Sequence, residues 1–367
     1  MKNKKILLLD NSSLTPVVNE IYCETKTGEF ATELKYLGNK VTMYGQLVDE
    51  KNTVHAYRLK ENGIDVVGVK RKKNKLINYF ILYFLAVPEI IKADFVYVFY
   101  PSALKYTSFL CWLLRTPYGV YVRGEQGVES KISKWIYRNA FLILTVTDHF
   151  TQLINKITNK NTAHTIRPMI PLTEKNIVRN REYQSKKHYE ILFLARIEAD
   201  KGIKELLLAI AELKENYSFT LDLVGSGGYL KQAKILIKEL NIADVVKVHG
   251  AVLEPDKIKQ FYLKADLYIL PTYHEGFPRT LYEAMIFGTP IITTFVGGIP
   301  GLMTDCYNCL EIKPKSVNSI VNCLVYVFDH YPSVAELTFN ATKTVLPIIQ
   351  SSRQSHAEHL NTLMREC

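Results

Sequence analysis

The chain has 367 residues, of which 47% are hydrophobic and 22% are charged, and its formal net charge is +10. This composition excludes a disordered chain, and the length favours two domains over one. Residues 1–170 hold 24 basic and 14 acidic side chains, whereas residues 171–367 hold 22 of each, so the excess charge suits either an anionic partner (nucleic acid, acidic lipid or a phosphate-bearing substrate) or simple solubility.

The chain begins MKNKKILLLD, in which only a short apolar run separates the lysines from Asp10. A secretory signal needs a longer apolar segment and a small-residue cleavage site. We therefore interpret residues 5–9 as a buried strand and expect the protein to stay in the cytoplasm.

Apolar β-rich runs alternate with helical patterns, such as 204–214 and 256–265, along the whole chain. Continuous apolar strands separated by helices predict parallel sheets covered on both faces. A polar segment with two prolines, residues 167–188, suggests a boundary between domains 1–170 and 171–349, with a C-terminal helix at about 350–367 packing back on the first domain. The expected strands are 5–9, 40–44, 64–69, 94–100, 118–122 and 142–147, followed by 189–195, 219–224, 245–250, 266–270 and 290–294.

Two weak candidate sites lie in the first half. Gly28 follows the first strand, where it permits close approach to a phosphate or serves as a plain helix entry. Arg123, Glu125 and His149 follow later strands and are candidate acceptor-side groups, because ligands of parallel sheets bind at the carboxyl ends of the strands.

A basic cluster, Lys70 to Lys73 with Lys75, immediately precedes the longest apolar stretch, residues 76–91. Asn78, Pro88 and Glu89 interrupt this stretch, which is too short to span a bilayer. The pattern fits an interfacial helix at the inner face of the cell membrane, but a buried helix beside a charged loop is the slightly favoured interpretation.

The strand at 189–195 is followed by Arg196 and Lys201, both at the same edge of the expected sheet. Two cations can neutralise a diphosphate, the arginine through a forked contact and the lysine as a point charge. Glu198 and Asp200 lie between them, so a solvated loop of mixed charge is the alternative. On the diphosphate interpretation no metal or other cofactor is required.

The next strand leads into a glycine loop that contains Gly225 and Gly227. The third glycine of a GxGxxG fingerprint is absent, and the loop follows the second strand of its domain, which argues against a nicotinamide site. The loop either lets backbone approach a nucleotide or only turns the chain.

The segment HEGFPRTLYEAMIFGTP, residues 274–290, holds two glutamates eight positions apart. Pro278 suits a helix start and Gly288 a helix end, so a helix is expected from about 278 to 287. Its N-terminus suits a phosphate, and Glu275 and Glu283 on either side suit the hydroxyls of two rings, as in a nucleotide sugar. The alternative is that Glu275 caps the helix and Glu283 is solvated.

Cys306 and Cys309 form a lone CxxC without a second pair, so we expect ordinary reduced cysteines and no zinc site.

Taken together, the runs ARIEADKG, LDLVGSGG, VHGAV and ADLYILPTYHEGFPRTLYEAMIFGTP resemble the donor half of a family 4 (group 1) glycosyltransferase over about 190–315. The resemblance implies the GT-B fold, two Rossmann-like doubly wound parallel-sheet domains facing a central cleft. It also implies transfer of a hexose-type sugar from a nucleoside-diphosphate sugar to a hydroxyl of a saccharide or lipid-linked saccharide, with retention, in polysaccharide or glycolipid biosynthesis.

The resemblance also implies a role for each matching residue. Glu275 holds sugar hydroxyls, Glu283 holds the ribose, and Arg196 with Lys201 stabilises the departing diphosphate. Backbone contacts to the donor fall to Gly28, Gly225, Gly227, Val252, Gly276, Phe277, Pro278, Thr280 and Leu281.

This chain departs from the family pattern in places. The first-domain glycine pair is a single glycine, and Arg123 with Gly124 stands where many members have a histidine. The glutamate that often follows the second glycine pair is missing near Ile299. Two other functions stay open: a nicotinamide-dependent oxidoreductase, and a non-catalytic binder of nucleotide sugar or nucleic acid, although nucleic acid is not the expected partner.

Overall fold

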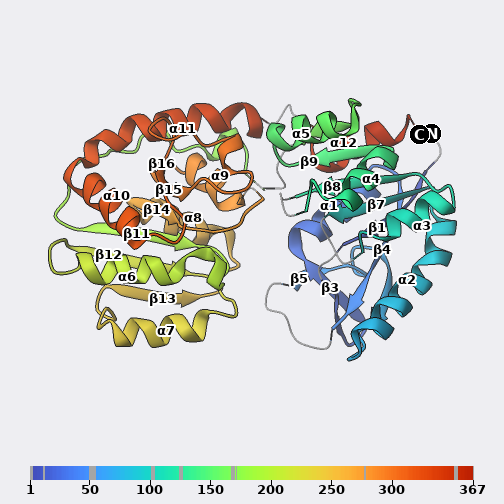
Figure 1. The fold of residues 1–367 in the computed structure, drawn as a ribbon, viewed down its shortest axis with the longest axis horizontal. Coiled ribbons are helices and arrows are strands. Elements are labelled where there is room, and N and C mark those ends of the chain that lie inside the picture. The colour runs from blue at the N-terminus through green and yellow to red at the C-terminus, as the bar shows by residue number, and fades with distance from the viewer. Residues whose placement is uncertain are drawn as a thin grey trace. The chain divides into compact units, whose positions relative to one another are not determined.

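Two parallel sheets organise the chain in the computed structural model. By backbone contacts, residues 1–170 together with 354–367 form the N-terminal unit, and residues 171–353 form the C-terminal unit (Figure 1). The structure describes residues 3–10, 13–48, 55–100, 104–123, 127–166, 170, 172–276, 278–350 and 354–366.

The N-terminal sheet is parallel throughout, with strand order β10-β9-β8-β7-β1-β4-β6. Its register places Leu8 opposite both Met43 and Tyr97, so one buried leucine joins three strands. Strand order reverses between β1 and β7, which makes that pair the topological switch point. The strands are β1 Lys5–Leu9, β4 Lys40–Leu47, β6 Asp65–Lys70, β7 Phe95–Tyr100, β8 Tyr118–Val122, β9 Leu142–Thr145 and β10 Ala163–Thr165.

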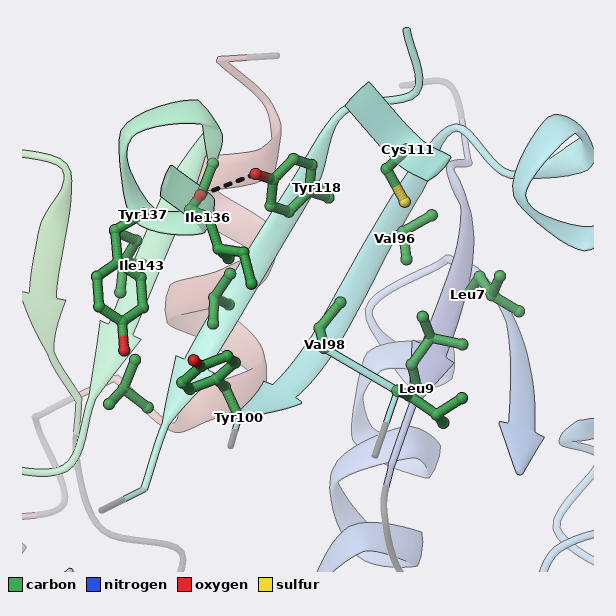
Figure 2. Close-up of a cluster of buried hydrophobic side chains, with 14 of the residues drawn as sticks. Leu7, Leu9, Val96, Val98, Tyr100, Cys111, Tyr118, Ile136, Tyr137 and Ile143 are labelled. Carbon is green, nitrogen blue, oxygen red and sulfur yellow. Dashed lines mark hydrogen bonds between the residues drawn. The ribbon is translucent and has the colours of Figure 1, made fainter. Parts of the chain in front are cut away.

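Helices cover both faces of this sheet, which confirms the doubly wound arrangement. Figure 2 shows one of the two apolar cores, in which the Tyr118 hydroxyl of β8 donates to the Ile136 carbonyl of α4 at 2.8 Å. The first face carries α2 Lys75–Lys92, α3 Thr107–Leu113, α4 Lys131–Asn139 and α5 Asp148–Thr158, and the second carries α1 Thr25–Tyr36 and α12 His356–Met364.

A small antiparallel sheet accompanies the N-terminal unit, and the sequence does not predict it. Its strands are short, mixed in polarity and, in one case, interrupted by Pro16, so they lack both a continuous apolar run and a clean alternation. The strands are β2 Thr15–Val17, β3 Glu20–Glu24 and β5 His55–Arg58.

The C-terminal sheet is also parallel and has the order β13-β12-β11-β14-β15-β16. This is the 3-2-1-4-5-6 order of a dinucleotide-type Rossmann sheet, with its switch point between β11 and β14. The strands are β11 Tyr189–Leu194, β12 Phe219–Val224, β13 Val246–Gly250, β14 Leu267–Leu270, β15 Ile291–Thr294 and β16 Leu310–Ile312.

The strands of the C-terminal unit alternate with helices, as the sequence pattern predicts. The α-helices are α6 Ile203–Leu213, α7 Leu230–Glu239, α8 Pro255–Lys264, α9 Arg279–Ile286, α10 Val317–Asp329 and α11 Val334–Ile349. The 3-10 turns among the described residues of this unit are η1 Glu174–Asn176, η2 Ala199–Lys201, η3 Ile299–Gly301 and η4 Tyr331–Ser333.

The polar segment before β11 packs on the C-terminal unit. Arg181 donates to the carbonyl of Tyr262 at 3.0 Å and to Thr289 Oγ1 at 3.3 Å, and the Tyr183 hydroxyl donates to the carbonyl of Gly288 at 2.7 Å. Cations near a helix C-terminus satisfy its last carbonyls. The segment therefore fixes the ends of α8 and α9.

Within the described part of the chain, no helix combines the length and the apolar character needed to cross a membrane. The described cysteines are free thiols, including Cys306 and Cys309. Burial, together with the negative charge of Asp305, raises the pKa of both thiols, so they stay protonated.

Candidate functional site

The candidate site is at the switch point of the C-terminal sheet. Open parallel sheets bind ligands at the carboxyl ends of the two strands where the order reverses, here β11 and β14. The loop after β11 carries Arg196 and Lys201, and the loop after β14 carries Glu275. The topology thus brings together two segments that lie about seventy residues apart in the chain.

Lys201 and Glu275 form the central contact of the site. Lys201 is only 3% exposed, and its Nζ lies 2.5 Å from Glu275 Oε1. The same ammonium donates to the His274 carbonyl at 3.1 Å and to Thr272 Oγ1 at 3.4 Å. Its three protons therefore each find an acceptor on the loop after β14, which offsets the cost of burying the charge.

Backbone packing holds both loops in place. Gly297, in the loop after β15, has φ +60°, and a Cβ on it would lie 1.7 Å from the carbonyl oxygen of Glu275. A Cβ on Gly202, directly after Lys201, would lie 2.0 Å from the carbonyl oxygen of Pro271. Only glycine fits such backbone contacts, so the two glycines set the positions of Glu275 and Lys201.

Arg196 emerges from a second packed loop. The Ile197 N–H donates to the Ser226 carbonyl at 2.9 Å, and a Cβ on Gly225 would lie 1.9 Å from the Ala195 carbonyl oxygen. A Cβ on Gly227 would likewise lie 2.4 Å from the Ile197 carbonyl oxygen. These glycines therefore join two loops of the protein, while Arg196 is exposed and forms no ion pair with the residues that the structure describes.

Helix α9 begins at Arg279 with Pro278 as its N-cap and ends beside Gly288, within a residue of the expected bounds. The N-cap makes no side-chain hydrogen bond, and the carboxylate of Glu275 pairs with Lys201, so the alternative that Glu275 caps this helix is wrong. The first N–H groups of a helix have no acceptor within the helix and suit an anion.

Two buried tyrosines fix the first turns of α9. Tyr268 OH donates to Thr280 Oγ1 at 2.6 Å, and Tyr262 OH donates to Glu283 Oε2 at 3.0 Å. Burial raises the pKa of both phenols well above the ordinary value, so they remain donors. Glu283 is half-buried and hydrogen-bonded, which contradicts the alternative of a solvated helix residue.

The remaining donor-side candidates take different places in the C-terminal unit. Val252 is half-buried in the loop after β13, Gly276 is half-buried beside Glu275, and Leu281 is fully buried in α9. Phe277 lies outside the described residues.

In the N-terminal unit, Gly28 is not in a loop before a helix, contrary to expectation. It lies inside α1, whose N-cap is Glu24, and a Cβ on it would lie 2.2 Å from the ring of Tyr57. Gly28 therefore makes room for a tyrosine of the same unit, and this contact gives no support to a role against a phosphate.

Of the acceptor-side candidates, Arg123 and His149 follow the neighbouring parallel strands β8 and β9. Arg123 Nη2 lies 3.5 Å from Asp10 Oδ1, and Thr27 Oγ1 donates to Asp10 Oδ2 at 3.1 Å. His149 is an exposed residue in the first turn of α5, with its ring 5.7 Å from that of Phe150. Glu125 lies outside the described residues.

Four residues that position these groups were not identified from the sequence: Asp10 in the N-terminal unit, and Tyr262, Tyr268 and Gly297 in the C-terminal unit. The tyrosines lie among apolar residues, so the sequence pattern indicates core residues. Asp10 follows a strand but belongs to no motif with a recognisable spacing. The glycine pair at 297–298 was the one usable signal, because adjacent glycines after a strand indicate a close backbone approach.

Metal ligands do not gather in the described part of the chain: no group of three or more His, Cys, Asp or Glu side chains is placed to hold an ion. Lys201 and Arg196 both contribute positive charge to the site.

Comparison with known proteins agrees with this picture. Residues 174–344 match the family model "Glycosyl transferases group 1". The chain is 32% identical over 130 residues to the uncharacterized glycosyltransferase MJ1607 of Methanocaldococcus jannaschii, covering 35% of this chain and 33% of that protein. It is 32% identical over 122 residues to the putative colanic acid biosynthesis glycosyltransferase WcaL of Escherichia coli, covering 31% of this chain and 30% of that protein.

The chain thus spans about a third of the length of these two relatives. Across its whole length it resembles the crystal structure of HepE from Anabaena in complex with UDP-glucose, with a TM-score of 0.70, 17% identity and 99% of each chain covered. That likeness and the two parallel-sheet units show the GT-B fold.

Proposed function

We propose that this protein is a glycosyltransferase. Its GT-B fold and the match of residues 174–344 to the group 1 glycosyl transferases support this proposal. It moves a hexose-type sugar from a nucleoside-diphosphate sugar to a hydroxyl group of a saccharide or a lipid-linked saccharide. The relative WcaL is named for colanic acid biosynthesis, which supports a place for this protein in polysaccharide or glycolipid assembly. The proposed place of the reaction is the cytoplasmic side of the membrane.

One observation carries the proposal: the ion pair of Lys201 and Glu275 at the switch point of the C-terminal sheet. The pair places a cation, which attracts a diphosphate, directly beside a carboxylate, which accepts hydrogen bonds from vicinal hydroxyls. A nucleotide sugar is the ligand that presents a diphosphate and a hydroxyl-bearing ring in adjacent positions. In the complex, Lys201 Nζ exchanges one of its hydrogen bonds to the loop after β14 for a hydrogen bond to a phosphate oxygen, and Glu275 binds the hydroxyls of the hexose.

The other donor contacts surround this pair. Arg196, exposed on the neighbouring loop, adds a forked contact to the diphosphate. Glu283, oriented by Tyr262, accepts from the ribose hydroxyls. Backbone N–H groups at the start of α9 face the phosphate end, and Val252 lies on the loop that receives the base.

The reaction forms one bond and breaks one bond at the anomeric carbon of the sugar. The acceptor oxygen attacks that carbon, the bond from carbon to phosphate oxygen breaks, and the nucleoside diphosphate leaves with the bonding electrons. The acceptor proton passes to the departing phosphate, on the same face, so the anomeric configuration is retained. Lys201 and Arg196 stabilise the charge that develops on the leaving group.

Lys201 and Arg196 can neutralise the diphosphate charge that other transferases neutralise with a divalent metal ion. We therefore expect turnover to be unchanged by EDTA. A loss of activity in EDTA that returns with Mg²⁺ or Mn²⁺ would show that a metal carries part of this charge.

A nicotinamide-dependent oxidoreductase is the weaker alternative. The glycine loop follows β12 instead of the first strand β11, and Gly225 and Gly227 pack against the loop that carries Arg196. A non-catalytic binder would keep the donor contacts without turnover, so only an activity assay separates it from the proposal.

A panel of UDP-, GDP- and ADP-sugars tests the function. One nucleotide series is expected to raise the thermal unfolding temperature and, with an acceptor or water, to release nucleoside diphosphate. Stabilisation without any release would favour a non-catalytic binder. No response to any sugar nucleotide, with a response to NAD(H) or NADP(H), would overturn the proposal.

A further inference from the structure

Helix α2 presents an apolar face that no described residue of its unit covers. Leu76, Phe80, Phe84 and Ile91 are exposed by 83%, 71%, 66% and 63%. With about 100° between successive residues, they fall on a stripe roughly 80° wide along a helix about 27 Å long. Phe80 and Phe84 stack on one another with ring centroids 6.1 Å apart.

The opposite face of α2 is the one that packs on the sheet. Its buried residues are Asn78, Leu82, Ala86 and Ile90, spaced by four as in one stripe of a helix. The interpretation of residues 76–91 as a buried helix is therefore wrong for half of the helix surface.

The neighbouring helix α3 also exposes apolar side chains. Helices α2 and α3 pack side by side, as Figure 1 shows at the edge of the N-terminal unit, and Tyr83 of α2 meets Tyr106 beside α3 with ring centroids 6.3 Å apart. Trp112 and Leu113 of α3 are also exposed. A large exposed apolar patch on a folded unit marks a binding surface for a protein or a membrane.

The charge around α2 distinguishes these partners. The segment that enters the helix, residues 70–75, has five exposed cations, and residues 66–88 contain no acidic side chain. Arg71, Lys72, Lys73 and Lys75 form no ion pair with residues that the structure describes. A second copy of this chain would bring the same excess of positive charge, whereas an anionic lipid surface offers the opposite charge.

We propose that α2, its basic entry segment 70–75 and the exposed end of α3 form a docking surface for an anionic lipid bilayer. The helix lies in the plane of the interface with Leu76, Phe80 and Phe84 among the acyl chains, and the cations of the entry segment meet the phosphate headgroups. Neither step uses the donor site, so the docking surface does not depend on the transferase activity.

Binding to vesicles tests the surface directly. The wild-type protein is mixed with vesicles of phosphatidylcholine alone and with vesicles that contain about one third phosphatidylglycerol, and the bound fraction is measured by flotation. We expect binding to the anionic vesicles only, weakened by salt. The two tryptophans, Trp112 and Trp135, both belong to this unit, so their emission should shift to the blue on binding.

Two variants and matched controls locate the surface. The double variant Phe80→Ser/Phe84→Ser is expected to lower the partition coefficient at least about tenfold, whereas Phe339→Ser, equally exposed at 70% in the other unit, leaves it unchanged. The triple variant Lys72→Gln/Lys73→Gln/Lys75→Gln should lose about fivefold for each charge removed. Its control is Lys231→Gln/Lys234→Gln/Lys238→Gln on α7, where three exposed lysines share a helix.

The outcomes separate the possible occupants. Failure of the wild type to bind anionic vesicles, or unchanged binding by both α2 variants, would overturn the proposal. A dimer seen by light scattering and lost in Phe80→Ser/Phe84→Ser, without vesicle binding, would assign the face to a second copy. Because no nucleotide sugar is present, each result leaves the proposed transferase function untouched.

Discussion

Each unit has a switch point at the carboxyl edge of its parallel sheet, but different contacts hold the residues at the two edges in place. At the C-terminal switch point, Lys201 and Glu275 are held by loops whose backbones touch at Gly202 and Gly297. At the N-terminal switch point, Asp10 follows β1 and is held by the side chains of Thr27 and Arg123. The first edge depends on glycines at fixed spacing, and the second depends on side chains from distant segments.

This difference has a functional meaning under the proposed activity. A site that must hold the same diphosphate in many proteins needs fixed backbone geometry, which glycine motifs provide. A site for a variable acceptor needs only side chains that can be exchanged. If the C-terminal edge is the rigid, catalytic one, substitutions there should have the largest effects.

The largest effect is expected at the buried cation. Lys201→Ala removes the charge beside the leaving diphosphate and should lower turnover about a thousandfold, the range for one lost electrostatic group in an active site. Lys204→Ala, an exposed lysine one turn further along, should retain wild-type turnover. Steady-state release of nucleoside diphosphate measures both, and near-normal turnover in Lys201→Ala would contradict the assignment.

The next effect concerns the backbone contact at Glu275. Gly297→Ala places a Cβ 1.7 Å from a carbonyl oxygen at φ +60° and should destabilise the C-terminal unit by about 3 kcal/mol or more. Gly250→Ala has a similar φ of +72° but no atom within 4 Å, so it should lose only about 1 kcal/mol. Urea unfolding compares the two, and equal losses would mean that strain in φ, and not the contact, decides the cost.

The N-terminal unit should respond to pH through His356. Burial lowers the pKa of this imidazole well below its ordinary value, and the charges of His359 and Arg123 lower it further. The folded unit therefore keeps His356 neutral, while the unfolded chain takes up a proton near pH 6.5. The free energy of unfolding should fall as the pH drops below 6.5, by up to about 1.4 kcal/mol per pH unit.

Tryptophan fluorescence follows this unit, since both tryptophans belong to it. His356→Gln should flatten the pH dependence between pH 5 and 7, and the exposed His330→Gln should not. If His356→Gln keeps the wild-type slope, the pH dependence comes from another group.

The smallest effect is expected from the tyrosines under α9. Tyr262→Phe removes the hydrogen bond to Glu283 and should weaken donor binding by about 1–2 kcal/mol, seen as a higher KM with little change in kcat. Tyr217→Phe removes a hydroxyl that donates to the carboxylate of Asp329 at 3.2 Å on an exposed surface, and it should change neither. A fall in kcat alone for Tyr262→Phe would place Glu283 at the chemical step instead.

Much of this architecture was predictable from sequence, for a physical reason. The central strands of both sheets are buried on both faces, so they form continuous apolar runs, and β1, β8 and β12 match the expected ranges. Strands β2, β3 and β5 lie on a small peripheral sheet and lack such a run, and the short edge strands β10 and β16 were missed as well.

The part of the site that strand topology positions could be predicted from the sequence, and the part that buried side chains position could not. Lys201 and Glu275 follow strands that meet at a switch point, so topology places them together. Tyr262 and Tyr268 could not be predicted, because a tyrosine in an apolar segment has the pattern of a core residue. Only the structure shows the acceptor of each hydroxyl.

Calorimetric binding of two ligands tests the central claim, that Lys201 holds the diphosphate and Glu275 holds the sugar. The ligands are the nucleoside diphosphate and the corresponding nucleotide sugar, titrated into the wild type, Lys201→Ala and Glu275→Gln. The account predicts that Lys201→Ala weakens both ligands, whereas Glu275→Gln weakens only the nucleotide sugar. Equal affinity of Glu275→Gln and the wild type for the nucleotide sugar, or unchanged binding of the nucleoside diphosphate by Lys201→Ala, would contradict it.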